Sequence, residues 1–235
     1  MPPSSTFQTH CWKKTALGSD IALASSAPLS ELRDQKPLVI IGGVHGDEPE
    51  GIELARQTLS WLQKEQDRGE KLRPWIVIPC LNVDGAAKNE RVNGRGVDLN
   101  RNYPSRDWSP VSDKPRYSPG PHPGSEPEVQ AVVELINQVS PIALIHCHSW
   151  EPCIVCTGQT GLSLAEPLSR SSGYNLVDDI GYPTPGSLSA YGWFDKQIPV
   201  ICIEERDGVS DLTAIWPRFA PAMREIFITQ FKATS

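Results

Sequence analysis

The stretch Leu38–Glu48 reads LVIIGGVHGDE and carries the pattern from which the fold can be predicted. Its first four residues are apolar without interruption, which predicts a strand buried on both faces of a sheet. Two glycines follow, and they allow the chain to turn sharply just before His45. A helix is predicted next over residues 50–66, where apolar residues recur at helical spacing. This first unit is therefore a buried strand, a tight turn and a helix.

The same alternation continues along the chain. Apolar runs predict further buried strands at residues 75–78, 142–145 and 199–203. A helix is predicted to begin at Ser125, because serine caps helices well and a proline and a glutamate follow in the first turn. Strands that alternate with helices predict an α/β fold, in which a mixed, mostly parallel central sheet is flanked by helices.

A single domain is predicted over residues 1–235. That length can bury a large core, and no internal repeat or low-complexity linker divides the chain. The segment of about 1–36 is polar and is interpreted as irregular, apart from a hairpin around Gly18. The core of the domain is therefore expected to lie in the residues that follow.

Composition excludes several classes of partner. The net charge of −6 argues against nucleic acid, because phosphate binding needs a basic face. No apolar run approaches the roughly 18 residues that cross a bilayer, so no membrane partner is expected. The first residues lack a cationic head and an apolar stretch, so we expect a cytoplasmic protein whose six cysteines are reduced. Cys153 and Cys156 form a Cys-x-x-Cys pair, but a zinc ribbon needs a second pair and none is present.

Polar side chains follow the carboxyl ends of the predicted strands. His45 and Glu48 follow the first strand, His148 follows the strand at 142–145, and Glu204 follows the last. Open α/β sheets bind ligands at this edge, so these side chains are expected to converge. Two imidazoles and one carboxylate are typical of a catalytic zinc site, in which water takes the fourth position.

Two choices within this set follow from strand geometry. His146 and His148 point the same way in a strand, and His148 lies nearer the carboxyl edge, so we take it as the ligand. His146 is interpreted as a buried histidine bonded to a neighbour. Glu204 and Glu205 point to opposite faces, so only one of them can face the site. Ser149 is not expected to be a nucleophile, because no G-x-S-x-G elbow surrounds it.

Six motifs in order carry a family resemblance. They are HGDE at 45–48, NVDG at 82–85, DLNRNY at 98–103, SEPE at 125–128, IHCHS at 145–149 and IEERD at 203–207. Together they resemble the zinc carboxypeptidase family, of which carboxypeptidase A is the best known member. RVNGRGVD at 91–98 and GYPTPGS at 181–187 are similar to its bacterial murein peptide amidase branch. The resemblance covers about residues 36–208.

The resemblance implies a catalytic zinc centre. His45, Glu48 and His148 would bind one zinc ion per chain. Glu204 would be the general base, and Arg91 would polarise the carbonyl of the bond that is cut. These roles agree with the chemistry of the side chains, since a carboxylate can carry a proton from water to a leaving amine and a guanidinium can stabilise an oxyanion.

The resemblance also implies a substrate-binding set. Asn100 and Arg101 would hold a carboxylate of the substrate, which suits the planar fork of arginine. Tyr182 is similar to the tyrosine that closes over substrate in carboxypeptidases, although its spacing to the following Gly-Ser is one residue shorter than in the larger enzymes.

The implied activity is zinc-dependent hydrolysis of an amide bond in a small murein-derived peptide. The amidase branch implies the bond between γ-D-glutamate and diaminopimelate, which a cytoplasmic enzyme would meet during peptidoglycan recycling. Three alternatives remain: a carboxypeptidase acting on ordinary peptides, a deacylase of the aspartoacylase kind, and a zinc-binding module without catalysis. The Asn-Arg-Asn-Tyr-Pro run from Asn100 and the Glu-Arg-Asp run from Glu205 favour the peptidase side, and the general base Glu204 argues against a non-catalytic module.

Overall fold

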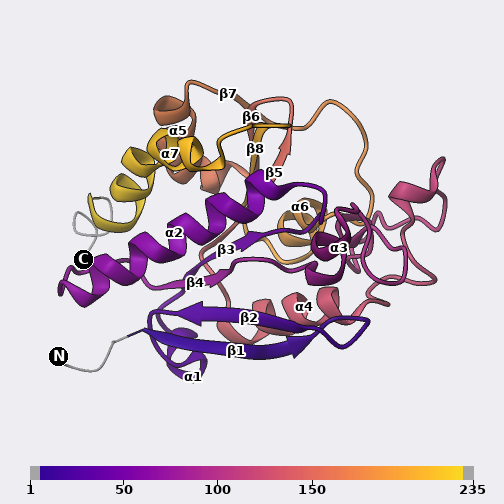
Figure 1. The fold of residues 1–235 in the computed structure, drawn as a ribbon, viewed down its shortest axis with the longest axis horizontal. Coiled ribbons are helices and arrows are strands. Elements are labelled where there is room, and N and C mark those ends of the chain that lie inside the picture. Colours follow the sequence, from indigo (N-terminus) through magenta and orange to yellow (C-terminus); the bar gives the residue numbers. More distant parts are fainter. Residues whose placement is uncertain (1–5, 230–235) are drawn as a thin grey trace.

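The apolar runs form the centre of one eight-stranded sheet with helices on both faces, in a computed structural model that describes residues 6–229 (Figure 1). The strand order is β1-β2-β4-β3-β5-β8-β6-β7. The strands are β1 Phe7–Lys14, β2 Asp20–Ser25, β3 Leu38–Gly42, β4 Trp75–Ile78, β5 Ala143–Trp150, β6 Cys153–Thr157, β7 Asn175–Val177 and β8 Val200–Arg206. The helices are α1 Leu29–Leu32, α2 Pro49–Asp67, α3 Val83–Lys88, α4 Pro127–Val139, α5 Leu162–Ser172, α6 Leu188–Ala190 and α7 Ile215–Arg224. Residues 1–5 and 230–235 of the predicted domain lie outside the described part.

The four central strands, β4, β3, β5 and β8, run parallel to one another. Antiparallel pairs attach β2 and β1 on one side of them and β6 on the other, and β7 runs parallel to β6. This confirms the predicted mixed, mostly parallel sheet. Because β3, β5 and β8 are parallel neighbours, their carboxyl ends meet at one edge of the sheet.

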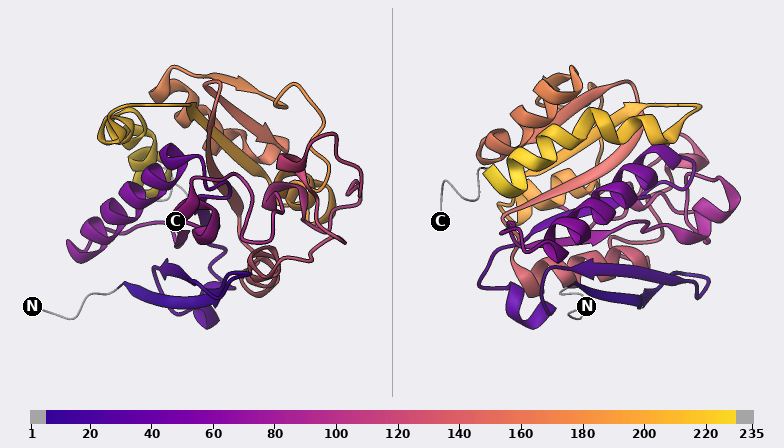
Figure 2. Two further views of the ribbon diagram at one scale, coloured as in Figure 1. Left: turned by 45° about the vertical axis from the view of Figure 1, so that its right-hand side comes forward. Right: turned by 60° about the vertical axis from the view of Figure 1, so that its left-hand side comes forward.

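Each face of the sheet has its own core. Helices α2, α5 and α7 pack on one face, against side chains such as Ile145 and Ile203. Helices α1, α4 and α6 pack on the other, against side chains such as Leu144 and Val200. In the right-hand view of Figure 2, α2 and α7 run side by side along the first face. Among the helices of residues 6–229, none is both long and apolar enough to span a bilayer.

The amino-terminal segment differs from its prediction. The expected hairpin is confirmed, with its turn just before Asp20. However, Phe7–Lys14 and Asp20–Ser25 are regular strands rather than irregular chain. Most residues of β1 are exposed, so this edge strand lacks the apolar alternation by which a strand is recognised.

The start of α2 is pressed against β5 at a glycine. A Cβ atom added at Gly51 would lie 2.3 Å from the carbonyl oxygen of Cys147, a backbone atom that cannot move aside. Glu48 immediately precedes α2, and His148 follows Cys147 in β5. The glycine therefore sets the separation between the segments that carry these two side chains.

We predict that Gly51→Ala weakens zinc binding by about 10-fold or more, comparable with the loss of an outer-shell contact, because the added methyl group pushes α2 away from β5. Zinc affinity can be measured by competition with a chromogenic chelator. Ser60→Ala, on the exposed side of the same helix, is the matched control and should leave the affinity unchanged. Equal zinc affinity in the two variants would show that this close approach does not set the site.

Candidate active site and metal centre

Three potential metal ligands converge at the carboxyl edge of the sheet. His45 Nδ1 lies 2.7 Å from Glu48 Oε1 and 3.0 Å from His148 Nδ1, and His148 Nδ1 lies 2.7 Å from Glu48 Oε2. His45 follows β3 through Gly43, whose φ of +59° suits glycine. Glu48 is the residue before α2, and His148 lies in the neighbouring strand β5. All three side chains are buried.

The hydrogen bonding of His45 fits a bound cation. Its Nε2 lies 3.1 Å from Asp98 Oδ1, and an ionised carboxylate only accepts, so the ring proton belongs on Nε2. In the neutral ring, Nδ1 then presents a lone pair towards the carboxylate of Glu48. Two lone pairs at such a distance repel unless a proton or a metal ion lies between them. Two imidazole nitrogens and a carboxylate are a ligand set that zinc prefers, so the residues present fit zinc.

Asp98 connects the metal ligands to Arg91. Its second oxygen accepts a hydrogen bond of 2.9 Å from Arg91 Nε, and Arg91 Nη1 lies 3.3 Å from Glu48 Oε1. Burial opposes ionisation of Asp98, but His45 and Arg91 nevertheless hold its pKa well below the usual range. The sequence alone predicted no role for Asp98. It lies 53 residues from His45, and only its place within the DLNRNY motif marked it.

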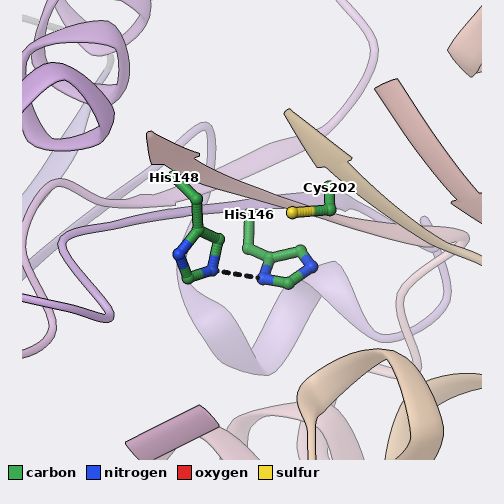
Figure 3. Close-up of side chains that lie close together, drawn as sticks. All are labelled: His146, His148 and Cys202. Atoms are coloured by element: carbon green, nitrogen blue, oxygen red, sulfur yellow. Dashed lines mark hydrogen bonds between the residues drawn. The ribbon is translucent and has the colours of Figure 1, made fainter. Parts of the chain in front are cut away.

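His146 is the buried, bonded histidine that the sequence predicted. Its Nδ1 lies 2.9 Å from His148 Nε2 (Figure 3). The other nitrogen of the His148 ring, Nδ1, faces Glu48. Its own Nε2 faces Ser189 Oγ at 3.4 Å. With Cys202, directly opposite on β8, His146 and His148 also form a second group that could hold a metal. His148 belongs to both groups, so the two share one ligand.

Glu204 and Glu205 lie on opposite faces of β8, as strand geometry predicted. Glu204 pairs in register with His148 and lines the same cavity, and Cys202 Sγ donates to its Oε1 at 3.2 Å. Burial raises the pKa of Glu204, and His148 opposes the rise. Glu205 is buried in the other core, where Tyr174 and Arg218 bind it. Only Glu204 is placed to act in the cavity.

The cavity has a volume of about 470 Å³ and is lined by His45, Glu48, His146, His148, Cys202 and Glu204. Arg91, Asn100, Arg101 and Tyr182 also line it. All eight site residues predicted from the sequence therefore surround one cavity, which is large enough for a small peptide.

Arg101 is a buried cation that forms no ion pair with any residue of the described part of the chain. Its side chain lines the cavity, and the residue is 7% exposed. Its Nη1 donates to the backbone oxygen of Asn100 at 2.8 Å, but no carboxylate among residues 6–229 lies within 4.0 Å. The side-chain oxygen of Asn100 accepts from the Leu188 amide, which leaves the NH₂ group to donate. The pair can therefore receive a carboxylate from outside the protein.

Tyr182 lies at the more exposed part of the cavity. It is 45% exposed, and its ring meets that of Trp150 edge-on, with 5.6 Å between the centroids. Its hydroxyl is thus carried on a segment with little burial, between β7 and α6.

Comparison with known proteins identifies the family. Residues 14–178 match the model of the zinc carboxypeptidase family, and the chain belongs to this family. The cofactor of the family is zinc, which agrees with the ligand set formed by His45, Glu48 and His148.

Several relatives carry one name. Murein peptide amidase A of Escherichia coli K12 is 32% identical over 164 residues, which cover 65% of this chain and 64% of that protein. The Vibrio campbellii protein of the same name is 30% identical over 187 residues, covering 74% and 71%. The matched segment thus spans slightly less than two thirds of the E. coli relative.

Solved structures show the same fold. The crystal structure of murein-tripeptide amidase MpaA from E. coli O157 has a TM-score of 0.71 and 26% identity, covering 94% of this chain and 91% of that one. Bovine thrombin-activatable fibrinolysis inhibitor has a TM-score of 0.75 at 19% identity, covering 94% and 88%. This second likeness concerns the fold alone.

We predict that the purified protein holds about one zinc ion per chain, and that His45→Ala and His148→Ala each lose it, because each removes a ligand. His146→Ala and Cys202→Ala should both retain the ion. The zinc affinity of His146→Ala should be lower by about 10- to 100-fold, because His146 orients the ligand His148 through a hydrogen bond. Metal analysis after gel filtration measures the content. Loss of zinc from Cys202→Ala with retention in His45→Ala would assign the ion to the second group.

Proposed function

We propose that this protein is a zinc-dependent amidase that cleaves the γ-D-glutamyl–diaminopimelate bond of small murein peptides. The observation that carries the proposal is the convergence of His45, Glu48 and His148 beside Glu204 in one cavity. Membership of the zinc carboxypeptidase family and the relatives named murein peptide amidase A support it. We take the protein to be cytoplasmic and to act in peptidoglycan recycling.

In this proposal His45, Glu48 and His148 hold the zinc ion. A zinc ion with an open position supplies a Lewis acid and makes water a nucleophile near neutral pH. Asp98 orients the His45 ring and His146 orients the His148 ring, each through the nitrogen that faces away from Glu48. Fixed rings keep the ligand nitrogens in place, as in other histidine metal sites.

Glu204 is the general base. Its carboxylate takes a proton from the attacking water and gives it to the leaving amine. The cross-strand pairing with His148 supports this role, because it brings the carboxylate to the ligand edge without making it a ligand. Burial, which raises the pKa of Glu204, makes it a better proton acceptor than an exposed glutamate.

Arg91 stabilises the negative charge that develops on the carbonyl oxygen. Its contacts with Asp98 and Glu48 use Nε and Nη1, so the guanidinium is held at one place while Nη2 is left to donate. A cation fixed before the reaction needs no reorganisation when charge develops, which is the basis of this kind of catalysis.

Arg101 and Asn100 bind the carboxylate on the carbon next to the leaving nitrogen. The guanidinium of Arg101, which is buried and has no ion-pair partner within residues 6–229, supports this assignment. In a murein tripeptide that carboxylate is free, because diaminopimelate is the last residue. Tyr182, on its exposed segment beside Trp150, closes over the bound peptide.

We predict that the protein releases free diaminopimelate from L-alanyl-γ-D-glutamyl-diaminopimelate, and that mass spectrometry identifies this product. A C-terminal lysine peptide and N-acetylaspartate should react far more slowly. Preferred cleavage of the lysine peptide would instead identify a carboxypeptidase for ordinary peptides, and preferred cleavage of N-acetylaspartate would identify a deacylase.

Two variants test whether Glu204 is the general base. Glu204→Gln should retain zinc but lose about 100- to 10,000-fold in turnover, since it removes proton transfer. Glu205→Gln is the matched control: it should keep its turnover per folded molecule while losing stability, because it weakens the contact with Arg218. Full activity of Glu204→Gln would exclude it as the base.

A further inference from the structure

Three arginines surround one tyrosine in the wall of the cavity. The guanidinium carbons of Arg91, Arg101 and Arg116 lie 5.2, 5.8 and 5.5 Å from the ring centroid of Tyr117. Tyr117 ends a short 3₁₀ turn in the long loop between α3 and α4, and all four side chains line the cavity. An aromatic ring attracts cations at such distances, so Tyr117 holds together three groups that repel one another.

The three arginines differ in how their charges are compensated. Arg91 contacts two carboxylates, Asp98 and Glu48. Arg101 has no carboxylate within ion-pair distance among the described residues, and Arg116 has only Asp47, at 3.4 Å. That separation is long for a charge-assisted hydrogen bond, which is typically about 2.7–2.9 Å. Arg116 is therefore a second cation available to a ligand, and its side chain is 56% exposed.

The two available cations flank the same ring, that of Tyr117, but differ in their other contacts. Arg101 adjoins Asn100, which is bonded to Leu188 at the start of α6. Arg116 contacts Asp47, which lies between the proposed zinc ligands His45 and Glu48 in the sequence. If Arg101 takes the leaving-group carboxylate, Arg116 is left for the acyl side of the bond. Of the other aspartates that line the cavity, Asp178, Asp179 and Asp207 come from the segments that follow β7 and β8, and Asp107 comes from the same long loop as Arg116.

We propose that Arg116, supported by Tyr117, is a second carboxylate subsite that binds a free carboxylate on the acyl residue of the substrate. The substrate class is thus a peptide with one carboxylate on each side of the bond that is cut. A γ-linked glutamyl residue meets this requirement, because its α-carboxylate is free. Three carbon atoms separate that carboxylate from the carbonyl carbon of the bond that is cut. This inference rests on the proposed function and assigns the residue that reads the acyl group.

The expected effect is modest because Arg116 is partly exposed. An exposed ion pair contributes less than a buried, charge-assisted hydrogen bond, and Arg116 lies between these two cases. The expected loss is therefore about 3- to 20-fold in kcat/KM, which corresponds to about 0.7–1.8 kcal/mol. The effect should appear in KM rather than kcat, and it should shrink as salt screens the charges.

The test crosses enzyme variants with substrate forms. The substrates are the murein tripeptide, the same peptide with the glutamyl α-carboxylate converted to an amide, and the same peptide with the carboxylate next to the leaving nitrogen converted to an amide. The enzymes are the zinc-loaded wild type, Arg116→Ala, Arg101→Ala and Lys114→Ala. Lys114 is an exposed cation of the same loop that does not line the cavity, so its variant is the matched control for loss of charge.

Arg116→Ala should lose about 3- to 20-fold on the free tripeptide and little on the glutamyl amide, because both changes remove one contact. Arg101→Ala should lose activity on the free tripeptide and on the glutamyl amide, but little on the peptide whose carboxylate next to the leaving nitrogen is an amide. Lys114→Ala should behave as the wild type on every substrate. An equal loss of Arg116→Ala on all three forms, or a wild type that does not distinguish the glutamyl amide, would overturn the inference and leave the amidase proposal intact. A wild type that cleaves none of the peptides would overturn both.

Discussion

The site depends on one close contact between two atoms that both act as hydrogen-bond acceptors. His45 Nδ1 and a carboxylate oxygen of Glu48 are 2.7 Å apart, while Asp98 accepts the proton on the other nitrogen of the ring. Two acceptors at this distance are favourable only with a proton or a metal ion between them. The buried carboxylates of Glu48 and Asp98 and the ring of His148 surround the place of that positive charge.

The regular strands of the sheet position these residues. Parallel pairing of β3, β5 and β8 brings three strand ends together. The strands β5 and β8 pair in register, so His148 lies opposite Glu204 on the face that α4 covers. The close approach at Gly51 then brings Glu48 to the same place. Residues far apart in the chain thus reach one cavity through regular structure, whereas Arg101, Arg116 and Tyr117 come from irregular turns.

Regularity also explains how much the sequence could predict. The period of two in a strand placed His146 and His148 on one face, and the position of His148 nearer the carboxyl edge favoured it as the ligand. The predicted contact of His146 with a neighbour is confirmed. The same period placed Glu204 and Glu205 on opposite faces. Strand β1 was missed because it is exposed and lacks an apolar pattern. The role of Tyr117 was also missed, because residues 82–123 carry no periodic signal and loop contacts depend on the whole fold.

We propose that zinc is bound by His45, Glu48 and His148 rather than by the group that contains Cys202. X-ray absorption at the zinc edge of protein loaded with one equivalent of metal measures the ligand atoms directly. We expect only nitrogen and oxygen ligands, at about 2.0–2.2 Å, with the multiple-scattering pattern of two imidazoles. A sulfur ligand at about 2.3 Å would place the ion at Cys202 and contradict this account of the site.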